Sequence, residues 1–457
     1  MRFGRWLPAL LAFSAAAAAL LVLSGAGAAA NGPDLSSPQS VDSYLLSIGV
    51  NPASVVKQNG NLNYAGPNCP GKAWNCTTAT RVVQVAAAGG KNRVDCTGAS
   101  GTEEGQTCVV VQTGDENSAR CVERSTAAAQ AQSCTITQTG ARNDALIDQS
   151  VDQNGGATQT VTQDASLTQT SSGSFNHGSI SQSAKQNTHD GPEQTQRADQ
   201  SLKVSQNAAG GAENKLNADQ SQDQNADGGL VQFQNFDASA LPDCLPVSPS
   251  SSPHVCANIS QSSQAGDNNA HLRQVVKEDA KSNDVATQNQ GNFAGGFDAR
   301  VHQDSVSGRQ HNDANQDKRQ HAKGAPGSTQ TQIDPLSCCG AGSQVGGADN
   351  HESINQTSSQ DATEPLAFQD STLIGQSLTP NGTCDVKQHA SNNSDSATNS
   401  ASLTPCPFLL VATECSSAVE EEPAGCTAFT PITTPPNECG IECVAIGPLA
   451  FFTRPQG

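Results

Sequence analysis

The stretch that decides the fold is Gln138-Thr-Gly140-Ala-Arg-Asn143-Asp-Ala145-Leu-Ile147-Asp-Gln149. Its skeleton is Q-x-G-x-x-N-x-A-x-x-x-Q. Asn143, Ala145, Ile147 and Gln149 are spaced two residues apart, so an extended strand places all four side chains on one face. Gly140 falls where the chain must turn between this segment and the one before it. The stretch therefore predicts a strand, a tight turn and a second strand.

The pattern recurs along the chain, with the asparagine three residues and the last glutamine nine residues after the turn glycine. Both amides follow Gly140, Gly173, Gly211 and Gly347, as Asn143 and Gln149, Asn176 and Gln182, Asn214 and Gln220, and Asn350 and Gln356. Chance would give about 0.3 such matches, so the repeat is real. From Gly155 the turn glycines follow at 18 to 20 residues, which we interpret as the repeat of one coil. The amides are predicted to form inward-facing ladders between coils.

This pattern resembles the repeat of the curlin family, the bacterial surface amyloid subunits, whose unit is S-x5-Q-x-G-x-x-N-x-A-x3-Q. The resemblance covers residues 58–240, with an echo near 340–360. In that family two strands flank the turn and the coils stack, so that like residues form ladders. The resemblance implies an all-β fold, a parallel β-solenoid of strand–turn–strand coils, and an amyloid-like surface role. The chain departs from the family in its many cysteines and in long insertions after Gly229.

The composition of the chain argues against some classes of binding partner and against a large ordinary hydrophobic core. The net charge of −19 argues against nucleic acid or anionic lipid as partners, because both require basic patches. Aromatic residues make up 4% of the chain, which is too few for a large ordinary hydrophobic core. A polar β-solenoid escapes this limit, because each strand hydrogen-bonds to its neighbours and stacked amides add further bonds.

The N-terminal sequence predicts a secretory signal peptide. Residues 1–30 combine Arg2 and Arg5 with an apolar run from Leu7 to Leu23 and a small-residue cleavage site at 28–30. A retained membrane anchor is the alternative for this segment. No later stretch is long enough to cross a bilayer, so no membrane span is expected after signal removal.

Residues 31–57 are expected to form an N-terminal helical cap that plugs one end of the stack. Ser40 is the predicted N-cap and Gly49 follows the predicted end. An unstructured leader is the alternative. The helix is predicted from helical spacing of Val41, Tyr44, Leu45 and Ile48.

The remaining chain divides by composition. Residues 58–149 hold cysteine-stapled coils, 150–240 the Gln/Asn-rich curlin-like array, and 241–362 a degenerate repeat region with loops. Within the last of these, 318–327 are expected to be exposed. Residues 363–457 are rich in Cys and Pro and are expected to form a disulfide-stapled tail, with disorder as the alternative.

Sixteen cysteines in an exported chain indicate disulfides. We predict sequential pairs that close the excursions between coils. A rival scheme pairs cysteines that stand in the same repeat column, Cys96 with Cys121 and Cys108 with Cys134. The predicted sequential pairs are Cys69–Cys76, Cys96–Cys108, Cys121–Cys134 and Cys244–Cys256.

Catalytic and metal motifs are scarce. Asp223, Asn225 and Asp227 match the start of a calcium loop, but Gln234 stands where the bidentate glutamate belongs, so a solvated turn is preferred. The sequence contains no recognised catalytic motif, and we expect no enzyme activity and no cofactor. Thr158-Gln-Thr160-Val-Thr162 and Thr168-Gln-Thr170 resemble the threonine rows of ice-binding solenoids.

These observations predict a secreted structural protein of the cell surface or extracellular matrix that acts by self-association or adhesion. Its partners would be further copies of itself or other surface components. One alternative is a monomeric secreted β-solenoid module that binds glycan or ice. The other is a largely disordered, low-complexity Gln/Asn-rich secreted chain.

Overall fold

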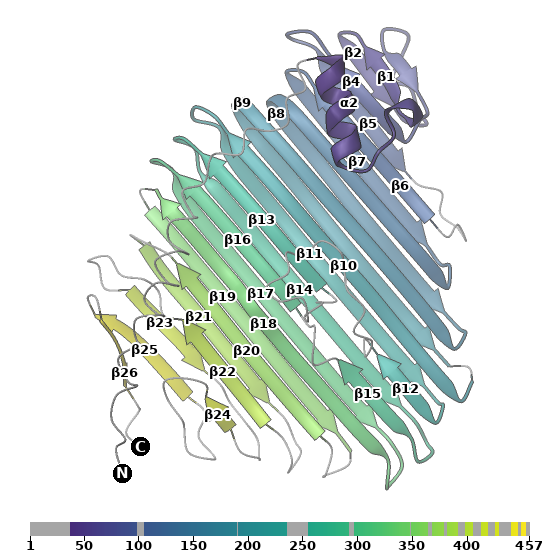
Figure 1. The fold of residues 1–457 in the computed structure, drawn as a ribbon, viewed down its shortest axis with the longest axis vertical. Helices are drawn as coiled ribbons and strands as arrows, with labels where there is room; N and C mark the ends of the chain where they lie inside the picture. Colours follow the sequence, from purple (N-terminus) through teal and green to yellow (C-terminus); the bar gives the residue numbers. More distant parts are fainter. Residues whose placement is uncertain are drawn as a thin grey trace, which may run out of the picture.

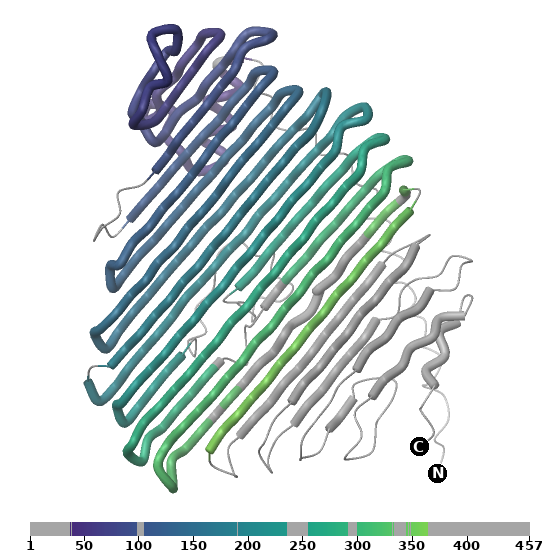
Figure 2. Tube along the Cα trace, turned by 180° about the vertical axis from the view of Figure 1, so that it is seen from behind, coloured from purple at the N-terminus to yellow at the C-terminus, as the bar shows by residue number. Residues whose placement is uncertain are grey.

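The computed structural model describes residues 37–97, 105–189, 191–234, 255–291, 297–347 and 349–363, together with the backbone of seven later strands. The expected signal segment lies outside the described residues, as does Cys244. The described residues form a parallel β-solenoid in which two layers of strands pack face to face (Figures 1 and 2).

The first layer contains the leading strand of each coil, and β8 and β9 are so long that each supplies a strand to both layers. In stacking order this layer consists of β1 (Val56–Asn59), β4 (Arg81–Val85), β6 (Gly105–Thr113), the first halves of β8 (Ala129–Asn154) and β9 (Thr158–Thr188), β10 (Glu193–Ala208), β12 (Val231–Gln234) with β13 (Val255–Ser263), β15 (Thr287–Gly291) with β16 (Phe297–Ser305), β18 (Thr329–Gly346), β20 (Phe368–Leu378), β22 (Thr398–Thr404) and β24 (Cys426–Ala428).

The second layer contains the returning strands. It consists of β3 (Asn75–Thr77), β2 (Leu62–Ala65), β5 (Lys91–Thr97), β7 (Glu116–Ser125), the second halves of β8 and β9, β11 (Glu213–Asp227), β14 (Asn268–Lys281), β17 (Arg309–Lys323), β19 (Asp349–Ala362) and β21 (Gly382–Ser391). A small antiparallel sheet follows, of β23 (Thr413–Ala418), β25 (Gly440–Ile446) and β26 (Leu449–Thr453). The solenoid therefore continues past residue 363, where the sequence predicted a separate tail.

The coils are narrow at both ends and wide in the middle. β1 has 4 residues and β24 has 3, whereas β9 has 31 and forms almost a whole coil. The plate in Figure 1 accordingly narrows toward β1 at one end and toward β24 at the other. Short edge strands offer few unpaired backbone groups to another chain, so the taper blunts both edges of the first layer. The second layer begins with β3, of 3 residues, and ends with β21, of 10 residues.

The length of a coil corrects the sequence interpretation. Asn143 stacks on Asn176 at a separation of 33 residues, and Asn176 on Asn214 at 38. The period of 18 to 20 residues is therefore half a coil. Gly155 and Gly191, with φ of 87° and 85°, lie in turns between coils, while Gly173 lies at the turn inside one. Both turns carry glycine, so the sequence pattern alone does not distinguish them.

Glycine at the inner turn is required by stacking. A Cβ on Gly140 would overlap the carbonyl oxygen of Gly114 in the coil before it. The same overlap would occur between Gly308 and the carbonyl oxygen of Gly266. The backbones of successive turns approach so closely that a side chain has no room, although neither of these glycines has a positive φ.

The N-terminal helix α2 (Pro38–Ser47) covers a face of the narrow end rather than its open edge. Ser37, not Ser40, is its N-cap: Ser37 Oγ accepts the backbone N–H of Ser40 at 3.1 Å, and Ser40 Oγ accepts that of Ser37 at 3.0 Å. Gly49 follows with φ of 75°, and the short 3-10 helix η1 (Pro52–Ser54) leads into β1. The apolar side of α2 packs on outward-facing valines of β4 and β6, namely Val83, Val109 and Val111.

Candidate functional site

The interior of the solenoid is built from amide ladders that run along the stack. The longest continuous one follows the glutamine two residues before the inner turn. In each coil Nε2 donates to Oε1 of the coil before, through eight hydrogen bonds of 2.7–2.9 Å. Its members are Gln58, Gln84, Gln112, Gln138, Gln169, Gln206, Gln261, Gln303 and Gln344. Nine coils are thus tied together by one row of side chains.

The asparagine ladder runs beside it with the opposite polarity. Each Asn Nδ2 donates to Oδ1 of the following coil, in six bonds of 2.8–2.9 Å from Asn63 to Asn268. Gln310 takes the next position and ends the series. Each Asn from Asn63 to Asn214 also donates to a backbone carbonyl oxygen near the turn. Asn176, for example, donates to the backbone oxygen of Asn207 at 2.9 Å.

The eight ladder residues named from sequence all lie in the interior with no exposed surface. Asn143, Asn176 and Asn214 are consecutive in one row, and Gln149, Gln182 and Gln220 in another. Asn350 and Gln356 occupy the same two rows in β19.

Further glutamine rows were missed. One contains Gln153, Gln186 and Gln224, and another contains Gln159, Gln196 and Gln234. A third contains Gln106, Gln132, Gln163 and Gln200. Their signal in the sequence is glutamine at every second position, as in Gln220, Gln222 and Gln224.

Glutamines also bridge the two layers. Gln182 Nε2 donates to the backbone oxygens of Gln163 and Ser201 in the opposite layer, each at 3.0 Å. The remaining space is filled by aliphatic residues such as Ile147, Leu167 and Ile180, which are fully or almost fully buried. Since an unpaired buried amide is costly, these bonds fix the register of both layers.

Glu123 replaces glutamine in the row of Gln149. Its Oε2 accepts from Gln149 Nε2 at 2.9 Å, and its Oε1 has no hydrogen-bond partner. Burial raises the pKa of this carboxyl to about 8, against a smaller opposing effect of the Gln149 bond. The side chain is therefore protonated at neutral pH and stands in for an amide.

Glu278 makes the same replacement elsewhere but has a cation beside it. The Nζ of Lys318 lies 3.9 Å from Glu278 Oε2, and both side chains are almost fully buried. Gln320 Nε2 donates to the same oxygen at 2.7 Å. Lys318 was expected on the surface, but its position in β17 points inward because the period-two alternation holds through this charged stretch.

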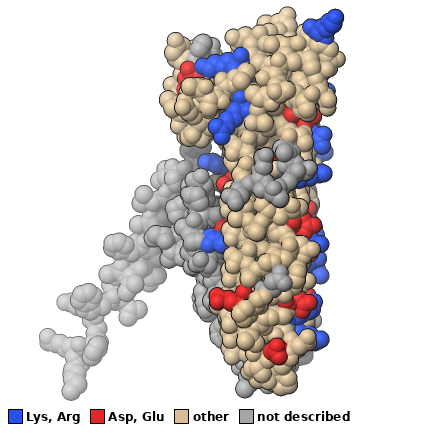
Figure 3. All heavy atoms as spheres, turned by 90° about the vertical axis from the view of Figure 1, so that its right-hand side faces the viewer, with Lys and Arg blue, Asp and Glu red and all other residues tan. Residues whose placement is uncertain are grey.

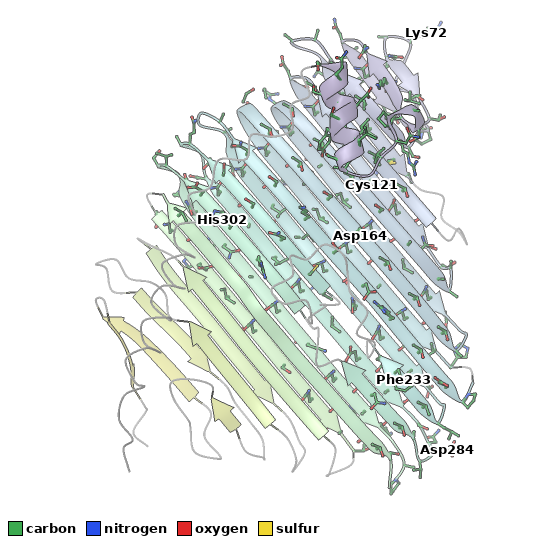
Figure 4. All side chains as sticks on the ribbon, viewed as in Figure 1. Lys72, Cys121, Asp164, Phe233, Asp284 and His302 are labelled. Atoms are coloured by element: carbon green, nitrogen blue, oxygen red, sulfur yellow. A yellow bond between two sulfur atoms is a disulfide. The ribbon has the colours of Figure 1, made fainter. Side chains whose placement is uncertain are left out.

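Three disulfides follow the sequential scheme. Cys69 pairs with Cys76, Cys96 with Cys108 and Cys121 with Cys134. Cys256 is also disulfide-bonded. The columns of the rival scheme exist, since Cys96 is in register with Cys121 and Cys108 with Cys134. In Figure 4 the labelled Cys121 lies at the end of the plate where α2 packs.

The candidate calcium residues lie in an extended strand. Asp223, Asn225 and Asp227 alternate with buried residues along β11 and point to its outer side. A straight strand cannot wrap its oxygens around one ion, as a calcium loop does. Within the described ranges, Cys108, Cys121 and Cys134 are the one group of three or more His, Cys, Asp or Glu with ligand atoms within 4.8 Å, and these sulfurs are in disulfides.

The two outer faces differ in chemistry. The face of the second layer carries acidic and basic side chains that pair between coils, as in Asp267 with Arg309 at 2.7 Å and Asp219 with Arg273 at 3.2 Å. Seen edge-on, many of these charged side chains lie along one side of the slab (Figure 3). The face of the first layer carries serine and threonine, including the predicted rows around Thr160 and Thr168.

The threonine face is interrupted in two places. The hydroxyl oxygen of Tyr44, from α2, lies 2.6 Å from Thr137 Oγ1 and covers part of it. Where β10 changes partner from β12 to β13, a cavity of about 620 Å³ opens between Thr160, Thr162, Arg197 and Phe233. An ice-binding face requires an uninterrupted flat array, so these features argue against that use.

Comparison with known proteins identifies no relative: no family model, curated protein or solved structure matches the chain. Among the residues that the structure describes, no helix is long and apolar enough to span a bilayer. Disulfides of the kind seen here are typical of proteins in oxidising, extracellular compartments.

Proposed function

We propose that this chain is an exported structural protein of the cell surface or extracellular matrix, a rigid plate that adheres through its broad faces. The observation that carries the proposal is the row of glutamines linked through nine coils, which fixes the long strands in one register. Such a core provides stiffness, and the charged second face provides contact surface.

The tapered ends favour adhesion by the faces over growth by end-to-end stacking. A curlin-like fibre needs terminal strands long enough in both layers to template the next copy. The first layer ends in β1 and β24, of 4 and 3 residues, and the second layer in β3 and β21, of 3 and 10 residues. The plate is thus completed within one chain. The same observation favours the second candidate, a monomeric binding module, over a fibre subunit.

The test is to purify the exported chain with its disulfides intact, then combine light scattering with electron microscopy and thioflavin fluorescence. We expect a monomeric plate that does not bind thioflavin as a fibre and that adheres to cell-surface or matrix preparations. Fibres of stacked plates from the full chain would contradict face-based adhesion and restore the curlin-like alternative. A monomer without adhesion would leave the plate without a structural role and contradict the proposal.

A further inference from the structure

A groove with two aromatic residues crosses the outer face of the second layer at its narrow end. It encloses about 400 Å³ and is lined by Trp74, Phe175, three basic residues and two acidic ones, in addition to polar groups of the strands. Trp74 and Phe175 are half-buried, so each presents part of its ring to solvent. Aromatic surface combined with a few polar groups is typical of a small-molecule site.

Trp74 is held by a stapled loop. The Cys69–Cys76 disulfide closes the segment, and the backbone N–H of Trp74 donates to Gly71 at 3.1 Å. The indole packs edge-on against Tyr64, with ring centroids 6.3 Å apart and an interplanar angle of 83°. The ring is therefore positioned by the fold before any ligand binds.

The floor of the groove is one row of side chains along the stack. Lys91, Glu116, Arg142 and Phe175 follow one another in register on β5, β7, β8 and β9. Successive coils are about 4.8 Å apart, close to the length of one pyranose unit in an extended saccharide chain. A linear saccharide along this row would meet one side chain per sugar.

The charges of the groove select an anionic ligand. Glu116 is neutralised by Lys91 Nζ at 2.6 Å and Arg142 at 3.4 Å, and its pKa is lowered, chiefly by the Lys91 hydrogen bond. Asp144 lies 3.4 Å from His177. Arg93 has no carboxylate within ion-pair distance among the described residues, although it lines the groove of a chain with net charge −19. A guanidinium in this setting binds a carboxylate in bidentate geometry.

We infer that this groove binds an oligosaccharide that carries carboxylate groups, with Trp74 and Phe175 stacking on sugar rings and Arg93 binding a uronate. The inference deepens the proposed adhesion by naming a ligand class. If the saccharide does not bind to the groove, the proposal of a plate that adheres through its faces still stands. If the protein forms fibres in the earlier test, the inference about the groove is unaffected. The two proposals can therefore fail separately.

Trp74 itself reports binding, because the chain has 2 tryptophans and the other, Trp6, lies in the expected signal segment. Trp74 is the only tryptophan of the exported chain. If the leader is retained, Trp74 is the only tryptophan of the full chain with Trp6→Phe. Tetragalacturonate is titrated into the protein while tryptophan fluorescence is recorded, with cellotetraose as the neutral probe. We expect saturable change with the acidic probe and at least tenfold weaker binding of the neutral one.

Arg93→Ala should weaken tetragalacturonate binding about tenfold or more, since a charge-assisted bond is lost. The matched control is Arg273→Ala, a half-exposed arginine on the same face outside the groove, which should bind as the parent does. Phe175→Ala tests the stacking contact, with circular dichroism and thermal melting to establish that each variant folds. Equal binding of both probes, equal loss in both arginine variants, or no saturable change would each overturn the inference.

Discussion

A single buried amide in a ladder should matter more than the same amide on the outer surface. Asn176 accepts from Asn143 at 2.8 Å and donates to Asn214 at 2.8 Å, whereas Asn187 lies in the same strand and points outward. Asn176→Leu removes the side-chain acceptor of Asn143 Nδ2 and the side-chain donor to Asn214 Oδ1, at a cost of roughly 1–3 kcal/mol. We expect a lower unfolding midpoint in denaturant for Asn176→Leu than for Asn187→Leu. Equal midpoints would show that the ladder does not stabilise the fold.

The two buried glutamates allow a test of charge in the ladder. The pKa of Glu123 is about 8 in the folded protein against a reference value of 4.5, so the folded state holds a proton that the unfolded state releases between these values. Stability contributed by this group is present below about pH 4.5 and is lost as pH rises to about 8, by up to about 1.4 kcal/mol per pH unit. Glu123→Gln should remove this dependence and stabilise the protein at pH 8.

Glu278→Gln is the matched control, because it makes the same change where Lys318 is the neighbour. Removing one partner of a buried ion pair, here the carboxylate 3.9 Å from the Lys318 ammonium, typically destabilises a protein by about 3–5 kcal/mol. Denaturant unfolding between pH 5 and 9 should therefore give shifts of opposite sign for the two variants at pH 8. Shifts of the same sign would contradict the assigned environments.

At the scale of the element, α2 provides adjacent leucines with opposite environments. Leu45 is fully buried against the valines of β4 and β6, and Leu46 is 64% exposed. Leu45→Ala should destabilise the docked helix by about 2–5 kcal/mol, whereas Leu46→Ala should have little effect. Limited proteolysis of the N-terminal segment measures this docking directly. Similar cleavage rates for the two variants would mean that α2 does not pack as described.

The disulfides constitute a second element-scale prediction. Non-reducing peptide mapping should recover Cys96–Cys108 and Cys121–Cys134 peptides, each of which closes an excursion between coils. Each bridge should contribute about 3 kcal/mol in the chain-entropy model. A Cys96–Cys121 peptide would instead establish the rival column pairing.

At the same scale, the ladder rows could be predicted from the sequence, whereas the coil length could not. The +3 and +9 spacing identified the two ladder rows because period-two alternation depends only on neighbours along the strand. Coil length depends on which of two similar glycine turns closes the coil, and that choice is made by long-range stacking. The position of α2 was not predictable either. The apolar side of α2 packs on Val83, Val109 and Val111, and the sequence does not show that these valines face outward.

At the scale of the whole molecule, the taper at the C-terminal end should control association. Deleting residues 363–457 removes β20, β21, β22 and β24 and leaves β18 and β19, of 18 and 14 residues, as unpaired edges. Long unpaired edges recruit other strands, so this variant should form oligomers or fibres in light scattering and electron microscopy. Deleting only residues 405–457 leaves β22, of 7 residues, and β21, of 10 residues, at the end, and this variant should remain monomeric. If both variants are monomers, edge length does not limit association.

The break between β12 and β13 bears on how much extra sequence the chain can carry. Ladder partners across this coil are 54 to 56 residues apart, as in Gln220 with Gln274 and Gln232 with Gln288, against 26 for Gln112 with Gln138. Each doubling of a loop adds only about 0.6 kcal/mol of closure entropy. The register on both sides nevertheless continues unchanged from β11 to β14. A foreign peptide or a whole domain inserted between Gln234 and Val255 should therefore leave the register of the strands on both sides unchanged.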